Sequence, residues 1–340
     1  MTKLSTQDRP GQLGRSWDRA PQDPGGLPAR ARIGTFVRRR RLAPYLLLIP
    51  ALIGVGWLIV WPTIQVGLFS FQNYGILQLA GVAPTRWVGL ANFITIFKDQ
   101  EFWVSLRNSC VFAAVVVPLT LVTGTCVGLL LNRLGPRMSL IVSGTTLLAW
   151  ATPTVAATVI FYWIFNPDGG VVDWALTRLP TWLGGGAATW AGFNWMSSAL
   201  PVYTVATLLL VWQGFPFIAV SVLAGLKTVP AELYEAARVD GAGPWQVFWK
   251  ITYPLLKPIF LVLLLLSVIW DFGVFPQLYI LTGSGANLDE YNLGIYVYQK
   301  AFSTPPSYGL GGALALVLTV ILLVITVGYV RASIKQGALQ

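Results

Sequence analysis

Asp271 is the residue whose type and position raise the clearest chemical question in this chain. It stands in the stretch SVIWDFGVF and is the only formal charge within six long apolar runs. A carboxylate in such a run is costly unless it faces a water-filled cavity or a polar partner. It therefore predicts either a contact with a polar solute or a structural hydrogen bond to a neighbouring helix.

Polar and aromatic side chains in the other runs suggest the same kind of chemistry. Sugars present hydroxyl groups that need polar partners and C–H faces that pack on aromatic rings. Gln213 can supply the first kind of contact and Phe217 the second, with Gly214 allowing close approach of the backbone. Trp270 beside Asp271, and Trp150 in AWATPT, offer further rings. These residues predict binding of a polar solute.

Bond-making chemistry is not predicted. The chain contains 0 histidines, which removes histidine general bases and HExxH zinc sites. The stretch AGLKTVP has a Lys-Thr pair but lacks the glycine spacing of a nucleotide-binding P-loop. We therefore expect neither an intramembrane enzyme nor a nucleotide site on this chain.

The residues that position these side chains form an all-α membrane protein. Of 340 residues, 55% are hydrophobic and only 11% are charged, against about 25% charged in soluble proteins. Runs of about 20 apolar residues are long enough to cross a bilayer. Six such runs predict six transmembrane helices, at Leu42–Ile64, Cys110–Leu131, Leu140–Phe165, Ala199–Leu226, Ile259–Leu281 and Leu310–Val330. A channel or secondary transporter would be expected to show an internal repeat or several intramembrane charges, and neither is visible.

The distribution of Lys and Arg predicts the orientation. With the N-terminus inside, 18 of the 23 cationic residues fall in inner segments, ten of them between Lys3 and Arg41. Cytoplasmic segments carry this excess, so both termini are expected in the cytoplasm. The tail at residues 1–41 is polar, basic and without apolar periodicity, which predicts disorder. Its charge sets topology, so the net charge of +10 requires no nucleic-acid partner.

Two shorter patterns make structural predictions. Residues 89–109, GLANFITIFKDQEFWVSLRNS, precede the second run and could form a short interfacial helix or an ordinary helical lead-in. Gly124 and Gly128 form a GxxxG step, which allows two helices to approach closely.

The least hydrophobic segment between two runs lies at about residues 228–258. Pro230 suits a first helical turn, and Glu232 and Glu235 suit the positive end of a helix dipole. Ala236 and Ala237 leave one face of this short helix shallow enough for another protein to approach. Glycines at 241 and 243 end the helix, and Pro244 begins a second one.

This segment resembles the EAA loop of permease subunits in binding-protein-dependent ABC importers. The resemblance rests on Glu235-Ala236-Ala237, on Gly241 six positions after Glu235, and on Ile251 and Pro254. The stretches WVGLANF, WQGFPF and FGVFPQLYILTGSG extend it to nearly the whole chain after residue 40, and it is closest to the larger permease of maltose importers. Tyr253 departs from the family, which usually has leucine there.

The resemblance implies a type I ABC importer permease fold over residues 42–340, in the bacterial plasma (inner) membrane, and import of an oligosaccharide or disaccharide. It implies that the EAA loop docks on a separate cytoplasmic ATPase through Glu235, Ala236, Ala237, Asp240, Gly241 and Ala242. It also implies a second, related permease, an extracytoplasmic binding protein, no metal and no cofactor. The implied sugar path is lined by Asp271, Gln213, Gly214, Phe217, Trp270 and Trp150. The alternative is import of another polar solute, such as glycerol phosphate.

Overall fold

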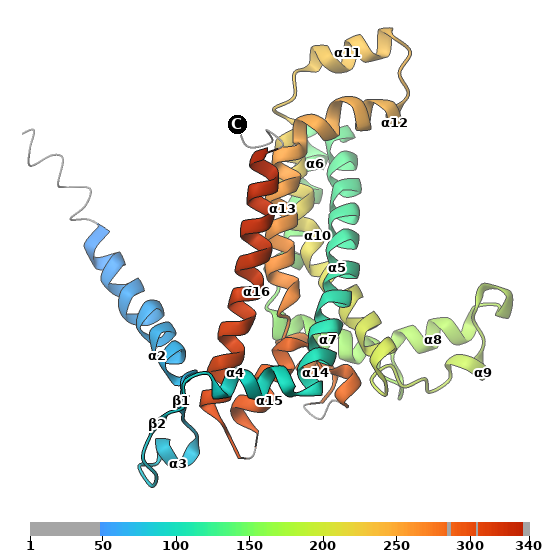
Figure 1. The fold of residues 1–340 in the computed structure, drawn as a ribbon. Coiled ribbons are helices and arrows are strands. Elements are labelled where there is room, and N and C mark those ends of the chain that lie inside the picture. The colour runs from blue at the N-terminus through green and yellow to red at the C-terminus, as the bar shows by residue number, and fades with distance from the viewer. Residues whose placement is uncertain (1–47, 284–286, 304, 336–340) are drawn as a thin grey trace, which may run out of the picture. The chain divides into compact units, whose positions relative to one another are not determined.

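The computed structural model describes residues 48–283, 287–303 and 305–335, and these residues are predominantly helical (Figure 1). The chain divides into two compact units, residues 1–62 and 63–340. Five helices in the described part of the chain are long and apolar enough to cross a membrane, or six if one bent pair counts as a single span. The all-α membrane fold expected from the sequence is confirmed, while the predicted disordered tail at residues 1–41 lies outside the described residues.

Within the described residues the first span covers Leu48–Phe69 and extends beyond the predicted end at Ile64. The predicted start, at residues 42–47, lies outside the described residues. The span contains a π-helical turn, η1 (Gly56–Val60), followed by α2 (Trp61–Phe69). Trp57 and Trp61 stack on each other across that turn, with ring centroids 6.4 Å apart.

The segment between the first and second spans is short and irregular. Strands β1 (Gln72–Asn73) and β2 (Arg86–Trp87) pair antiparallel, with Gln72 opposite Trp87. Helix α3 (Ile76–Leu79) lies between the strands in sequence, and α4 (Ala91–Lys98) follows them. Asp99 separates α4 from the next helix and caps that helix by accepting from the Glu101 N–H. Residues 91–98 are thus a short helix of their own, whereas residues 100–109 form the first turns of the spanning helix α5. Each of the two expected structures therefore applies to one half of the segment at residues 89–109.

The close pair of helices predicted by the GxxxG step is α5 (Gln100–Arg133) against α10 (Ala199–Leu226). A Cβ added at Gly124 would lie 2.5 Å from the Ile218 Cβ, and one at Gly128 would lie 2.8 Å from the Ala219 carbonyl oxygen. These distances are shorter than a van der Waals contact, so the two glycines allow a backbone approach that alanine would prevent.

The third predicted span is not one continuous helix. Helix α6 (Pro136–Ala151) and α7 (Thr154–Ile164) meet at an angle of 92°. Pro153 lies at the bend, where its ring removes a backbone donor and disfavours helical geometry at the preceding residue. The prediction of a single helix over Leu140–Phe165 is therefore wrong at residues 152–153.

The fifth span also differs from its prediction at both ends. Its helix begins at α12 (Pro244–Val247) rather than at Ile259, and passes through the π turn η3 (Phe248–Thr252) into α13 (Tyr253–Phe272). After α13 the chain leaves helical geometry at residues 273–275 and resumes as α14 (Pro276–Leu281). The prediction of a helix over Ile259–Leu281 missed this break. The last span, α16 (Tyr308–Lys335), contains the predicted run.

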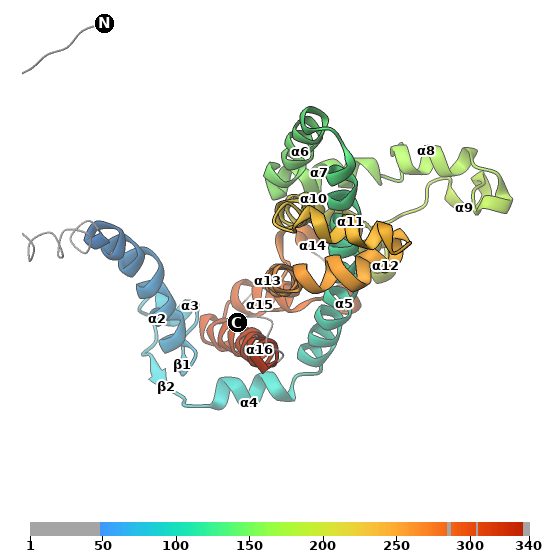
Figure 2. The same cartoon turned by 90° about the horizontal axis from the view of Figure 1, so that it is seen from above.

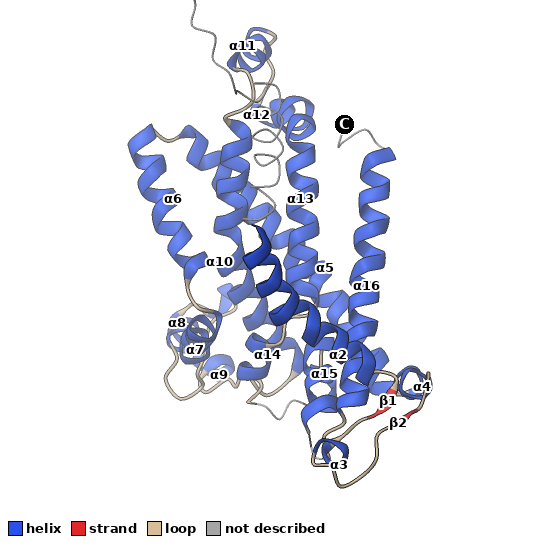
Figure 3. Cartoon of the chain, turned by 90° about the vertical axis from the view of Figure 1, so that its left-hand side faces the viewer, coloured by secondary structure: helices blue, strands red, loops and turns tan. Residues whose placement is uncertain are grey.

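The remaining helices of the second unit lie at two opposite ends of the long helices (Figures 1 and 3). Helix α11 (Ala231–Val239) lies at one end, between α10 and α12 in sequence. At the other end lie α8 (Val171–Arg178), α9 (Ala187–Trp190) and α15 (Leu293–Phe302). In sequence, the 3-10 turn η2 (Thr181–Leu183) lies between α8 and α9, and η4 (Leu288–Glu290) precedes α15. Helices α7 and α14, which follow the two breaks, lie toward this second end.

Candidate functional site

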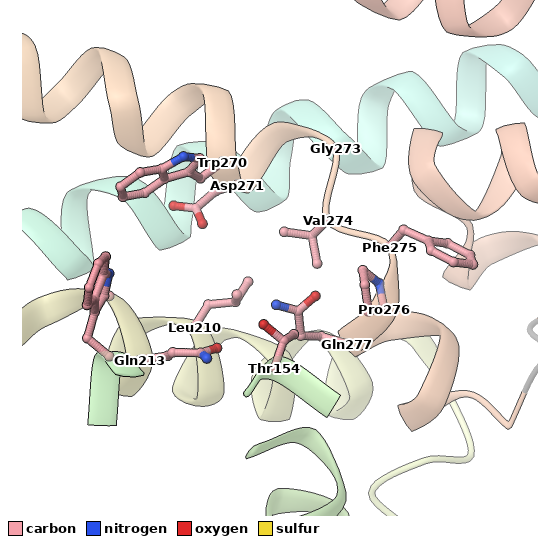
Figure 4. Close-up of a pocket in the computed structure, with 12 residues that line it drawn as sticks. Thr154, Leu210, Gln213, Trp270, Asp271, Gly273, Val274, Phe275, Pro276 and Gln277 are labelled. Atoms are coloured by element: carbon pink, nitrogen blue, oxygen red, sulfur yellow. The ribbon is translucent and has the colours of Figure 1, made fainter. Parts of the chain in front are cut away.

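A cavity of about 480 Å³ lies where the two broken helices face α10. Volumes of this size are typical of sites that hold small molecules. Figure 4 shows the carboxylate of Asp271 and the amides of Gln213 and Gln277 directed toward the same central space. The lining residues are Trp150, Thr154, Leu210, Gln213, Gly214, Trp270, Asp271, Gly273, Val274, Phe275, Pro276 and Gln277. This set contains one carboxylate and no lysine or arginine.

Asp271 is half-buried and is the last residue but one of α13, directly before the helix breaks at Gly273. No described residue gives its carboxylate a hydrogen bond or an ion pair. The structural alternative, a bond to a neighbouring helix, therefore has no partner among the described residues. A half-buried carboxylate without a partner is unfavourable unless water or a solute meets it.

Gln213 links α10 to the first helix break. Its Nε2 donates to the Thr152 carbonyl oxygen over 2.9 Å. Thr152 lies between α6 and α7, where the backbone no longer satisfies its own carbonyl groups, so the amide replaces a lost helical hydrogen bond. One end of the Gln213 amide thus has a structural role, while its Oε1 remains as an acceptor on the cavity side.

Aromatic rings form one wall of the cavity and the layer behind it. The Phe217 ring stacks on Trp150, with centroids 5.7 Å apart and planes 19° apart, and meets the edge of Trp270 at 5.5 Å. Both tryptophans line the cavity, whereas Phe217 does not and lies against them instead. Phe217 can therefore act on a solute only by orienting these two rings.

Gly214 combines two roles. It lines the cavity, and a Cβ at this position would lie 2.9 Å from the Thr120 Cγ2 of α5. The close approach of α5 and α10 thus extends to the level of the cavity. Of the six residues expected along the solute path, the structure brings five into the cavity lining and places the sixth, Phe217, behind it.

Sequence reasoning missed Gln277 and the break that carries it. The break leaves the Val274 carbonyl without a helical partner, and Asn292 donates its Nδ2 to that oxygen. Gln277 follows as the second residue of α14, and this residue is only 8% exposed. The glycine and proline at 273 and 276, inside an apolar run, were the signal that could have indicated a break.

A second candidate region is the segment around α11. Gly241 has a φ of +72°, a left-handed conformation that favours glycine, and Ala242 donates its N–H to the Ala237 carbonyl over 2.9 Å. Glu235, Ala236, Asp240 and Gly241 are exposed, Ala242 is half-buried and Ala237 is buried. Seen from above, α11 and α12 lie beside each other at this end (Figure 2). A groove of about 640 Å³ lies between them, lined also by the ends of α5 and α10.

Ionised side chains form a cluster at the opposite end, where α4 meets α5. The Lys300 Nζ lies 2.9 Å from Asp99 Oδ2 and 2.9 Å from Glu101 Oε2, and the Tyr296 hydroxyl donates to Asp99 over 2.7 Å. Burial acts to raise the pKa of Asp99, but the hydrogen bonds from Tyr296 and Lys300 outweigh it and lower that pKa. Burial acts to lower the pKa of Lys300, but its two carboxylate partners raise it. The shifted pKa values of Asp99 and Lys300 thus favour the charged forms of these two groups.

Among the residues that the structure describes, no group of three or more Cys, Asp or Glu side chains is placed to hold a metal ion. The candidate regions among the described residues are therefore the cavity, as a site for a solute, and the α11 segment, as a surface for another protein.

Comparison with known proteins identifies the family. Residues 124–338 match the model of the binding-protein-dependent transport system inner membrane component. The chain belongs to this family. It is a membrane-spanning permease component of an ABC importer and not itself an enzyme.

Individual relatives align with this permease over most of their length. The diacetylchitobiose uptake system permease of Streptomyces coelicolor is 40% identical over 312 residues, covering 92% of each chain. The sulfoquinovosyl glycerol transport permease of Agrobacterium fabrum is 34% identical, over 86% of this chain and 90% of that one. The trehalose/maltose transport permease of Thermococcus litoralis is 29% identical, over 84% and 92%.

A solved structure has the same fold. In the crystal structure of a bacterial ABC transporter that imports the acidic polysaccharide alginate, one chain superposes with a TM-score of 0.71 at 21% identity. The superposition covers 89% of this permease and 99% of that chain. The type I importer permease fold expected from the sequence is thereby confirmed.

Proposed function

We propose that this permease moves a carbohydrate, an oligosaccharide or disaccharide, into the cell through the cavity between its broken helices. The observation that carries the proposal is Asp271, a carboxylate without a described partner that faces a cavity lined by Trp150 and Trp270. Hydroxyl groups would supply the missing hydrogen bonds, and the rings would pack on the C–H faces of a sugar. Relatives named for diacetylchitobiose and for trehalose and maltose support the same solute class.

Transport would be coupled to ATP through α11. In this proposal the exposed residues Glu235, Ala236, Asp240 and Gly241, with the half-buried Ala242, seat in an ATPase subunit. Ala237, which the sequence also assigned to this contact, is buried within the permease and can only support the helix from behind. Closure of two ATPase subunits would then pull on α11, and α10 and α13, which lead into and out of this segment, would transmit the motion to the cavity. Small side chains on α11 and its left-handed end at Gly241 suit it to close contact with another protein.

The proposed assembly has further members. A second, related permease would complete the solute path, and an extracytoplasmic binding protein would deliver the sugar at the end that carries α14 and α15. The α11 end would face the cytoplasm, together with both termini. The excess of Lys and Arg in the segments at that end supports this orientation.

The alternative is another polar solute, such as glycerol phosphate. The permease named for sulfoquinovosyl glycerol, at 34% identity, keeps this alternative open. A phosphate would be expected to meet a cationic cavity, where arginine or lysine binds it strongly. The lining instead holds one carboxylate and no cation, which favours the sugar.

Uptake by the reconstituted complex tests the proposal. Proteoliposomes containing both permeases, the ATPase and the binding protein should accumulate a neutral disaccharide only when ATP is supplied. Asp271→Ala should lower this uptake at least about 10-fold, as expected for loss of a hydrogen bond to a charged group, while complex assembly and basal ATPase activity persist. Normal uptake by this variant would exclude Asp271 from the solute path, and uptake of glycerol phosphate alone would establish the alternative.

A further inference from the structure

Gln277 is a buried residue whose side-chain amide has no protein partner among the described residues. The residue is 8% exposed, lines the cavity and forms no hydrogen bond with any described residue. Amides of residues this buried are usually hydrogen-bonded, so an unpaired amide that reaches a cavity is available to a ligand or a bound water. Figure 4 shows the amide directed into the cavity, on the side opposite Asp271.

The local structure does not use this amide. The first turn of α14 is closed by its own backbone, with Tyr279 donating its N–H to the Phe275 carbonyl over 2.9 Å. The Val274 carbonyl, freed by the break, is satisfied by Asn292 rather than by Gln277. Pro276 at the first helical position fixes the entrance to the helix. An apolar side chain of the same size would serve the fold of α14 at least as well.

The amide and the carboxylate have complementary hydrogen-bonding capacities. An ionised carboxylate accepts only, whereas a glutamine amide both donates and accepts. Two hydroxyl groups on different edges of a sugar match this arrangement, because one can donate to Asp271 while the other exchanges hydrogen bonds with Gln277 across the cavity. Gln213 is less free to take part, since its Nε2 is already bonded to the Thr152 carbonyl.

The same lining disfavours an acidic sugar. A uronic acid would place its carboxylate near Asp271, and the residues that line the cavity include no lysine or arginine to offset the repulsion. We propose that Gln277 contacts the solute and, with Asp271, selects a neutral sugar that presents one hydroxyl group to each of them over a sugar acid of similar size. This inference rests on the proposed transport of a carbohydrate through the cavity.

Uptake and stability of Gln277→Leu together test the inference. Leucine removes the buried amide at similar volume, so the unfolding temperature of the purified complex should stay the same or rise. ATP-dependent uptake of the transported disaccharide, with the binding protein saturated, should fall at least about 10-fold. Thr282→Val is the matched control, because the Thr282 hydroxyl caps α14 by bonding the Leu278 carbonyl at 2.8 Å and does not line the cavity. The control should keep its uptake.

Monodeoxy analogues of the disaccharide, each lacking one hydroxyl group, test whether Gln277 contacts the solute directly or affects uptake through other residues. One analogue should be transported poorly by the wild-type complex yet lose nothing further in Gln277→Leu, because each change removes the same hydrogen bond. The wild-type complex should also take up the neutral disaccharide at least about 10-fold faster than the corresponding uronic acid, after correction for the affinity of the binding protein for each.

The outcomes distinguish failure of the proposed carbohydrate transport from failure of the proposed role of Gln277. If the wild-type complex transports no disaccharide, the proposed function fails. If it does, but Gln277→Leu transports normally or unfolds at a clearly lower temperature, the contact role of Gln277 is overturned and the proposed function stands. The inference alone would also be overturned if Gln277→Leu lowered the uptake of every deoxy analogue by the same factor as it lowers uptake of the disaccharide. Equal uptake of the disaccharide and the uronic acid by the wild-type complex would have the same consequence.

Discussion

The cavity and the α11 segment are both attached to α10 and α13, yet they leave opposite kinds of surface unsatisfied. The cavity holds polar groups without partners, namely the Asp271 carboxylate and the Gln277 amide, in a partly buried space. The α11 segment satisfies its own helix end through Ala242 and leaves small side chains such as Ala236 exposed.

This difference indicates what each region can receive. Unpaired polar groups in a cavity gain most from a solute that brings several hydrogen bonds. A shallow, exposed face gains most from a surface of matching shape, since close packing at an interface depends on contact and exclusion of water. Both kinds of surface are expected in this family, because an ABC importer permease must contact a solute and also an ATPase.

Replacing Ala236 with arginine should produce the largest effect. If α11 seats in an ATPase subunit, the variant buries an unpaired charge, which costs about 3–5 kcal/mol, and uptake should fall more than about 100-fold. Co-purification of the ATPase with the permease measures the lost contact. Val82→Arg, at another exposed apolar position of the second unit, between α3 and β2, is the control and should retain the ATPase. Normal co-purification and uptake in Ala236→Arg would remove α11 from the coupling path.

Replacing Phe217 with alanine should have an intermediate effect confined to the cavity. Phe217 supports Trp150 and Trp270 from behind, and an aromatic pair contributes about 0.5–1.5 kcal/mol beyond the area it buries. We expect the KM for uptake to rise about 5-fold while ATPase co-purification stays intact. Loss of the ATPase from this variant would show that a change in the cavity also disturbs the α11 segment, so that the two regions do not act independently.

Replacing Asp99 should have the smallest effect, on the free energy of unfolding. Unlike Asp271, the Asp99 carboxylate has partners, namely Tyr296 and Lys300. Its folded-state pKa lies below the unfolded value, so the stabilisation is present above about pH 4 and is lost as the pH falls through the folded pKa. Asp99→Asn should therefore lower the free energy of unfolding at pH 7 by about 1 kcal/mol or less, and the difference from the wild type should vanish near the folded pKa.

Asp271→Asn is the contrasting variant, measured by the same thermal unfolding at pH 7. It should not destabilise the permease, because its carboxylate has no described partner to lose. A clear loss of stability in Asp271→Asn would mean that this carboxylate is structural.

Much of the architecture could be predicted from the sequence because it depends on local composition. The apolar runs are long enough to require helices in lipid, and the glycines at 124 and 128 indicated a close helix pair. Helix α11 was predicted from Pro230, the acidic first turn and Gly241. The residues proposed to bind solute were chosen partly by family resemblance, and the structure brings most of them into one cavity.

The sequence by itself determined that this chain is helical and lipid-embedded, since its apolar runs leave no other way to satisfy the backbone in a bilayer. Only the tertiary structure decided where those helices break. A break requires a distant side chain to take the freed carbonyl group, as Gln213 does for Thr152 and Asn292 does for Val274. Those partners are separated along the chain and meet only when the helices pack. The same packing turned Gln277 inward, opposite Asp271.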